Sequence, residues 1–146
     1  MAYRLPRYRV ALVREGSSHT GKKHVHAPED VHKIIAAEYA DAVVETAMML
    51  ALDTKNKVIG VFTISTGSLN ASIIHPRDVF QRAILVNAAS VILVHNHPSG
   101  DPTPSPEDVK LTKKLVEAGR AMDITVLDHV ICGEGNFVSL RERGQL

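Results

Sequence analysis

The chain has 146 residues, enough for about one domain, and 45% of them are hydrophobic while 23% are charged. This composition is that of a globular protein and excludes a chain that is disordered throughout. The formal net charge of +1 is too close to zero for a chain-wide attraction to nucleic acid or to an acidic membrane surface. The single cysteine, Cys132, excludes an internal disulfide and a zinc site built from cysteines.

No apolar stretch approaches the roughly 18 residues of a membrane span, and Arg or Pro interrupts every short apolar run in residues 1–14. A free thiol is tolerated in a reducing compartment, and Cys132 is most simply a core residue. We therefore expect a soluble, cytoplasmic protein with no membrane partner.

The N-terminal region is the only basic part of the chain, with seven basic and three acidic side chains and four histidines in residues 1–33. Alternation in residues 7–14 (RYRVALVR) predicts an edge strand, and residues 15–27 predict a polar, mobile loop. We assign residues 1–26 to the same domain as the rest and read the basic segment as a solvated loop. His24 and His26 lack a stiff strand to position them, so we read them as solvated too, rather than as a metal site.

Pro28 and the acidic residues after it predict a helix start, but two readings of the following segment remain open. Propensity alone continues the helix to Leu52, because residues 36–52 contain no Gly or Pro. The alternative, which we prefer, is a buried strand over residues 43–52 that turns at residues 53–56 into a second strand over residues 58–65.

The remaining pattern alternates between strands and helices, which predicts one mixed α/β domain. A helix opens at Pro76 with apolar residues along one face, Ile84 included, and another opens at Pro106 with Leu115 and Met122 directed inward. The expected strands cover residues 69–74, 90–94, 124–132 and 137–140.

The most informative segment is residues 94–108, VHNHPSGDPTPSPED. His95 and His97 are two residues apart at the end of an apolar strand, so their imidazoles point to the same face. Asp108 lies in the first turn of the next helix, where the helix dipole favours an ionised carboxylate. Two imidazoles and one carboxylate are the ligands of a catalytic zinc site, which leaves one position open. We expect Zn²⁺ at His95, His97 and Asp108.

Ser105 has a purely structural interpretation beside any chemical one. Ser105, Pro106 and Asp108 form a capping-box pattern that stabilises a helix start. Asp101 competes with Asp108 as a ligand but stands in the stiff loop before the helix.

This motif resembles the JAMM motif of JAB/MPN-domain metalloproteases, in the form found in the RadC-like branch. The resemblance covers residues 27–146, which we assign to a RadC-like JAB/MPN domain. It matches a stand-alone form without the helix-hairpin-helix region of full-length RadC proteins. Further similar blocks are LDTKN (52–56), GSLNAS (67–72), HPR (75–77), PS (104–105) and LDHVI (127–131).

The resemblance implies an α/β fold with a mixed β-sheet flanked by helices, related in shape to cytidine deaminases, and so favours the hairpin over the long helix. It implies that Glu45 is the catalytic general base and acid. It also implies hydrolysis of a peptide or isopeptide amide, with the Ser105 hydroxyl stabilising the oxyanion. The partner would be a peptide or protein substrate, which the sequence does not identify; the oligomeric state is equally open.

Three rival functions are weighed against this one. A nucleobase deaminase requires H-x-E and P-C-x-x-C, which the chain lacks. A DNA-repair-associated or nucleic-acid-binding protein is the alternative, although the near-neutral charge argues against direct duplex binding. A catalytically inactive scaffold would typically lack ligands. Among the other polar residues, Asp128 and His129 can satisfy each other or support a ligand, and His75 reads as helix-entry structure.

Overall fold

The computed structural model describes residues 1–17, 21–39, 42–67 and 74–146. In this part of the chain the helices are α1 (Pro28–Tyr39), α2 (Pro76–Leu85) and α3 (Pro106–Ala121). The strands are β1 (Thr46–Leu52), β2 (Val58–Thr66), β3 (Ser90–Asn96), β4 (Thr125–Cys132) and β5 (Phe137–Ser139).

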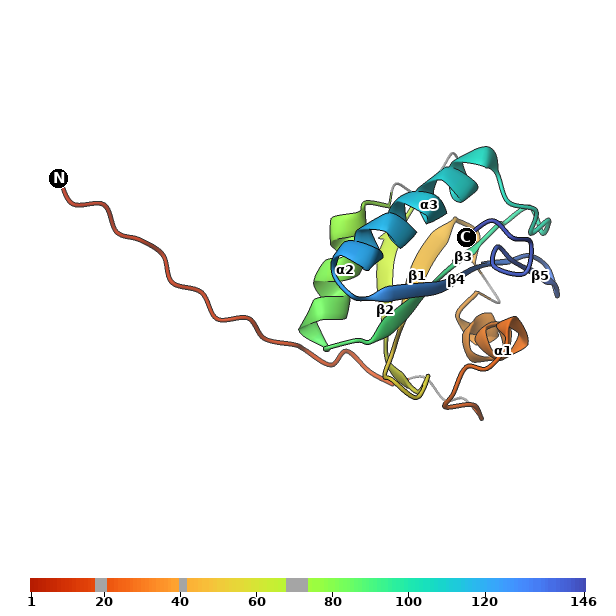
Figure 1. The fold of residues 1–146 in the computed structure, drawn as a ribbon, viewed down its shortest axis with the longest axis horizontal. Coiled ribbons are helices and arrows are strands. Elements are labelled where there is room, and N and C mark those ends of the chain that lie inside the picture. Colours follow the sequence, from red (N-terminus) through yellow and green to blue (C-terminus); the bar gives the residue numbers. More distant parts are fainter. Residues whose placement is uncertain (18–20, 40–41, 68–73) are drawn as a thin grey trace.

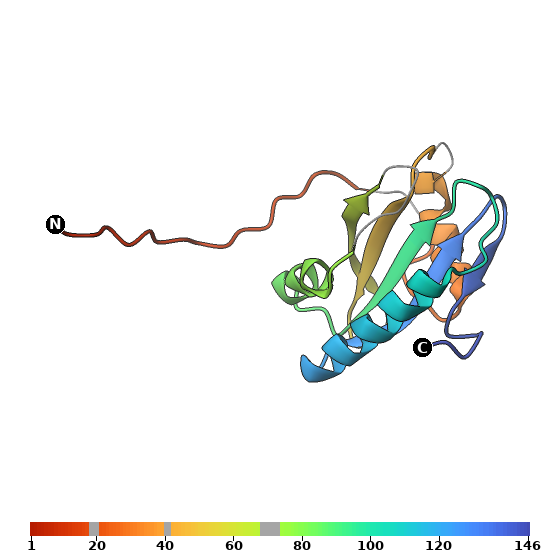
Figure 2. The same ribbon diagram turned by 90° about the horizontal axis from the view of Figure 1, so that it is seen from above.

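The strands form one mixed sheet in the order β2-β1-β3-β4-β5. β3 and β4 are parallel, because α3 connects them, and the other neighbouring strands are antiparallel. Figures 1 and 2 show α1 on one face of the sheet and α2 with α3 on the other. The expected mixed sheet flanked by helices is confirmed.

The core has two parts, one on each face of the sheet. Ile35 of α1 packs with Leu50 and Val94 on one face, and Phe80 of α2 packs with Leu93 and Leu115 on the other. β1 and β3 lie between these layers and are buried almost throughout. Burial on both faces removes the alternation that would mark β1 as a strand, so its sequence is equally compatible with a helix.

The hairpin reading of residues 43–65 is confirmed, with a correction at its start. β1 pairs antiparallel with β2, and Asn56 in the connecting turn has φ 60°, a left-handed conformation that Asn tolerates. The strand begins at Thr46 rather than at residue 43, so Glu45 precedes it. Just ahead of the strand, the Glu45 carbonyl accepts from the Gly67 backbone N–H at 2.8 Å. The Tyr39 hydroxyl contacts the backbone carbonyls of Thr46 and Val94, in β1 and β3, at 3.0 and 3.1 Å.

The helices begin at the predicted prolines, but two side chains expected on their inner faces are exposed. Ile84 of α2 is 54% exposed, because α2 lies at the margin of the sheet and only its Val79, Phe80 and Ala83 side is covered. Met122 is 41% exposed because α3 ends at Ala121 and the chain turns there.

The predicted N-terminal edge strand is wrong. Residues 7–14 have no strand pairing and run away from the domain in an extended path (Figures 1 and 2). Val10 and Leu12 are 71% and 56% exposed, so no burial offsets the entropy lost when a strand is ordered. The strand predicted over residues 69–74 falls largely outside the described residues.

Candidate metal centre

Four side chains from distant parts of the chain meet at the end of the central strand β3. His95 lies in β3 and is 2% exposed, His97 follows the strand, Asp108 lies in the first turn of α3, and Glu45 immediately precedes β1. One ligand atom from each of the four lies within 4.8 Å of the others, and we call these four residues the metal group. The structure thus brings together all three expected ligands and the carboxylate expected to act beside them.

The spacing of the nitrogen and oxygen atoms fits a small cation. His95 Nε2 lies 3.0 Å from His97 Nε2 and 3.4 Å from Asp108 Oδ1, and His97 Nε2 lies 3.3 Å from Asp108 Oδ2. A tetrahedral Zn²⁺ with ligand bonds of about 2.0–2.2 Å places its ligand atoms about 3.3–3.6 Å apart. Glu45 Oε1, at 3.3 Å from His95 Nε2, lies beside the same point. The donor set therefore fits a small cation such as zinc, with the two ring nitrogens, at 3.0 Å, somewhat closer than in an ideal tetrahedral site.

The loop after β3 sets the direction of the His97 ring. His97 Nδ1 donates to the backbone carbonyl of Asp101 at 2.9 Å, since a carbonyl can only accept. In the neutral ring this leaves the Nε2 lone pair facing Asp108. Asp101 therefore contributes its backbone, while its carboxylate accepts from the backbone N–H and hydroxyl of Thr103. Asp101 is not part of the four-residue group, so Asp108 and not Asp101 is the candidate ligand.

The charges in the group favour a cation. Burial alone would raise the pKa of Asp108, but the imidazoles of His95 and His97, which donate to its carboxylate when they carry a proton on Nε2, outweigh burial and hold that pKa well below 3.8. The hydrogen bond to Asp108 raises the pKa of His97 above 6.5. A negative field that favours a proton on His97 also favours a divalent cation between the rings and the carboxylates.

The capping box at the start of α3 is formed as the sequence predicts. Ser105 Oγ accepts from the Asp108 backbone N–H at 3.1 Å, and Asp108 Oδ2 accepts from the Ser105 backbone N–H at 2.9 Å. Capping thus fixes the Asp108 carboxylate beside the two imidazoles. Accepting this bond leaves the Ser105 hydroxyl proton available for a further acceptor.

Asn96, which sequence reasoning missed, holds the segment that carries Glu45. Its side-chain oxygen accepts from the Thr46 backbone N–H at 2.7 Å, and its side-chain nitrogen donates to the Val44 carbonyl at 3.1 Å. The two bonds therefore bracket Glu45 on both sides. The sequence feature that could have identified Asn96 is its position between His95 and His97, which places its side chain on the opposite face of the strand.

The other singled-out residues lie outside the group. His24 and His26 are exposed and stack with their ring centroids 6.0 Å apart. His75 occupies the N-cap position of α2 in an extended conformation, and its side chain makes no capping hydrogen bond. Cys132 is a core residue, and burial raises its pKa to about 12. The carboxylate of Asp128 accepts from the Ser139 hydroxyl and from two backbone N–H groups; it does not bind the imidazole of His129, which is directed instead toward His95.

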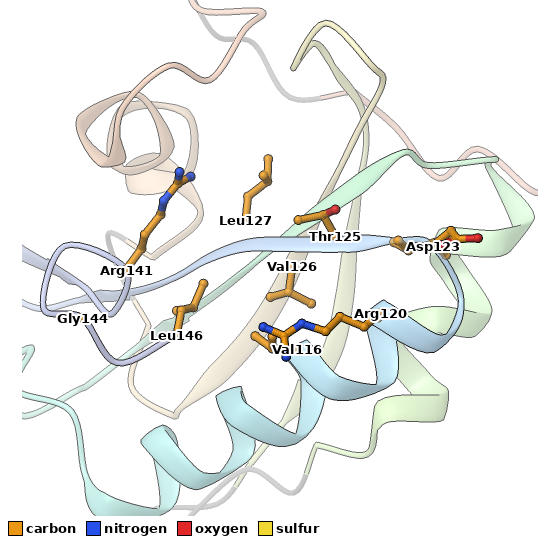
Figure 3. A pocket seen from close by; sticks show the side chains of 11 residues that line it. Val116, Arg120, Asp123, Thr125, Val126, Leu127, Arg141, Gly144 and Leu146 are labelled. Atoms are coloured by element: carbon orange, nitrogen blue, oxygen red, sulfur yellow. The ribbon is translucent and has the colours of Figure 1, made fainter.

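Cavities in the described part of the chain include two that lie along the sheet. One, of about 460 Å³, adjoins the metal group and is lined by Asn96 and His97, by His32 and Tyr39 of α1, and by the turn at Gly133–Gly135. The other, of about 610 Å³, lies at the start of β4 between α3 and the C-terminal segment (Figure 3). Arg120 and Arg141 line this second cavity, and none of the four clustered residues does. Of the four clustered residues, only His97 lines the first cavity.

The fold and the site define a mixed α/β domain with a candidate metal centre of two histidines and acidic residues at the end of its central strand. The chain belongs to the RadC-like JAB domain family, whose model matches residues 25–145. The family resemblance read from the motif is thereby confirmed.

The chain is similar to several proteins that carry the family designation UPF0758. It is 56% identical over 120 residues to one from Caldanaerobacter subterraneus subsp. tengcongensis, an alignment covering 82% of this chain and 52% of that protein. It is 49% identical over 123 residues to one from Methanosarcina barkeri, which covers 84% and 54% respectively. The chain thus spans about half the length of the curated relatives it matches. Across its described residues, no helix has both the length and the apolar character to cross a membrane.

Proposed function

We propose that this domain is a zinc-dependent hydrolase of peptide or isopeptide amide bonds. One observation carries the proposal: Glu45, His95, His97 and Asp108 converge within 4.8 Å although they come from three separate parts of the chain. Two imidazoles with one carboxylate are the protein ligands of catalytic zinc sites, and a further carboxylate beside them suits a general base.

His95, His97 and Asp108 would hold the metal. When bound in such a site, Zn²⁺ supplies Lewis-acid chemistry, which polarises a carbonyl and lowers the pKa of water from 15.7 to about 7. The protein contributes the orientation of the three ligands: His95 through burial, His97 through the Asp101 carbonyl, and Asp108 through the capping box.

Glu45 would move the proton. Its carboxylate takes a proton from the attacking water as the new carbon–oxygen bond forms at the amide carbon, and it then gives that proton to the leaving nitrogen as the carbon–nitrogen bond breaks. The Ser105 hydroxyl, which accepts from the Asp108 N–H, would donate its own proton in a hydrogen bond to the oxygen that becomes negative.

The substrate would be a peptide or a protein. A cavity of about 460 Å³ is lined by His97 and by His32 and Tyr39 of α1, and a part of such a substrate could lie there. The free thiol of Cys132 suits action in a reducing cytoplasm.

Metal analysis of purified variants tests the proposal. Wild type is expected to hold one zinc per chain, and His97→Ala is expected to lose it because one of three ligands is gone. Glu45→Ala is expected to keep the zinc and to lose hydrolysis. Hydrolysis is measured on a peptide library by mass spectrometry. His24→Ala is a matched control, because His24 is exposed and outside the group; it should retain both zinc and hydrolysis.

Equal zinc contents in wild type and His97→Ala would remove the proposed metal centre. Full hydrolysis by Glu45→Ala would leave the metal centre in place but overturn the role of Glu45.

A further inference from the structure

A chain of short hydrogen bonds runs behind His95, on the side away from the metal group. His95 Nδ1 lies 2.6 Å from His129 Nε2, and His129 Nδ1 lies 2.6 Å from the Thr112 hydroxyl. The Thr112 hydroxyl in turn lies 2.7 Å from the backbone carbonyl of Asp108. Thr112 and His129 are both 0% exposed, so water does not compete for these bonds.

The carbonyl at the far end sets the direction of every bond in this chain. A carbonyl only accepts, so the Thr112 hydroxyl donates its single proton to the Asp108 carbonyl. The hydroxyl oxygen then accepts from His129 Nδ1–H. A neutral His129 then has no proton on Nε2 and accepts from His95 Nδ1–H. Because a neutral imidazole carries one proton, His95 Nε2 keeps its lone pair.

That lone pair faces the metal group. The opposite tautomer of His95 would place a proton on Nε2, the atom expected to bind a cation, where Glu45 Oε1 and Asp108 Oδ1 lie 3.3 and 3.4 Å away and can accept it. That tautomer would break the bond to His129 and leave a fully buried nitrogen unsatisfied, which is unfavourable.

We infer that Thr112 and His129 are positioning residues of the metal centre, which hold His95 in the tautomer that presents its Nε2 lone pair. The inference rests on the proposed zinc site and adds residues that prepare it without touching the metal. The same helix α3 supplies the Asp108 carboxylate and, through the Asp108 carbonyl, the end of the hydrogen-bond chain. α3 thus positions two of the three ligands together.

The experiment combines an imidazole tautomer measurement with a zinc affinity measurement. Two-bond ¹H–¹⁵N correlation spectra of the zinc-free wild type are expected to show His95 and His129 protonated at Nδ1. Zinc affinity is measured by competition with a chromogenic chelator. Thr112→Val has nearly the same shape as threonine but removes the hydroxyl; it is expected to mix the His95 tautomers and to weaken zinc binding about 10- to 100-fold.

Two further variants separate positioning from general damage to the fold. Thr112→Ser restores the hydroxyl and is expected to return both the tautomer and the zinc affinity to wild type. Thr125→Val makes the same substitution at an exposed residue and should change neither measurement.

The outcomes are distinguishable from failure of the proposed function. Thr112→Val with wild-type zinc affinity and an unchanged His95 tautomer overturns the inference while the metal centre stands. A wild type protonated at His95 Nε2 overturns it without any variant, so the test holds even if Thr112→Val does not fold. A wild type that binds no zinc overturns both.

Discussion

Asn96 shows how one side chain outside the metal group can control the chemistry within it. It bonds the backbone on either side of Glu45, and those two bonds tie this segment to the end of β3. The segment precedes β1, and its backbone is also held by the Gly67 N–H, which donates to the Glu45 carbonyl at 2.8 Å. The position of the Glu45 carboxylate therefore depends in part on Asn96.

Replacing Asn96 by alanine is expected to lower hydrolysis while leaving zinc content unchanged. The Glu45 segment would shift once both bonds are lost, and a misplacement of about 1 Å can cost on the order of 100-fold in rate. The measurement is hydrolysis together with zinc stoichiometry and the thermal midpoint. Loss of zinc in this variant would contradict the assignment, because it would mean that Asn96 acts on the ligands.

Residues of the site differ in how far the sequence predicts them. His95, His97 and Asp108 lie within 14 consecutive residues, and their relative positions follow from strand alternation and helix capping, which are local. Glu45 lies 50 residues before His95, so it came only through the family resemblance. His129 meets His95 through the pairing of β3 with β4, and Thr112 meets His129 because α3 packs against β4; no local pattern encodes either contact.

The start of α1 depends on Asp30, which lies at the third position of the helix. Its carboxylate accepts from the backbone N–H groups of His26 and Ala27, at 2.9 and 3.2 Å, and pairs with Lys22 at 3.2 Å. The bond from the His26 N–H is the main cause that lowers the pKa of Asp30 below 3.8.

Asp30→Ala is expected to lower the free energy of unfolding by about 1 kcal/mol at pH 7, as the loss of a helix cap does. Because the folded-state pKa lies below the unfolded value of 3.8, the contribution is present above about pH 4 and is lost as the pH falls further. Denaturant unfolding at several pH values measures the difference. A difference that grows as the pH falls would contradict this origin.

The turn between β4 and β5 supports the loop that carries His97. A Cβ at Gly133 would collide with the Gly100 carbonyl, and the Glu134 backbone N–H donates to that same carbonyl at 3.0 Å. The two loops therefore pack backbone against backbone, which only glycine permits at this position.

Gly133→Ala is expected to destabilise the fold by about 1–3 kcal/mol and to weaken zinc binding by displacing the His97 loop. Gly21→Ala is the matched control, since nothing lies within 4 Å of a Cβ there. Thermal unfolding and zinc competition measure the two effects. Wild-type behaviour of Gly133→Ala in both would show that the loops can separate without consequence.

A strand with one exposed face could be predicted from the sequence, whereas a strand buried on both faces could not be told from a helix. β2 alternates between exposed and half-buried residues and was predicted almost to its ends, whereas β1 needed the family resemblance to be told from a helix. Residues 7–14 have the alternation of a strand but no neighbouring strand, so the sequence pattern predicted a strand that the structure does not contain.

At the scale of the whole molecule, metal binding by the four-residue group is coupled to the stability of the fold. Its four residues come from the segment before β1, from the end of β3 and from α3, so unfolding separates them completely. A ligand that binds only the folded state shifts unfolding by mass action.

Zinc at 100 times its dissociation constant is therefore expected to stabilise the protein by about 2.7 kcal/mol, which raises the thermal midpoint by roughly 5–10 °C. Calorimetry with zinc and with a chelator measures the shift, and His97→Ala should show much less of it. An equal shift in that variant would point to binding elsewhere.

The sequence by itself determined the local chemistry: two imidazoles on one face of a strand end, a carboxylate fixed by a helix cap, and the starts of the helices. These follow from interactions between residues close in the chain. The tertiary structure decided where β1 begins, which side chains hold Glu45 and His95, and that the N-terminal segment stays unpaired. Those outcomes depend on strand register and on burial between layers, which are set by contacts between residues far apart in the sequence.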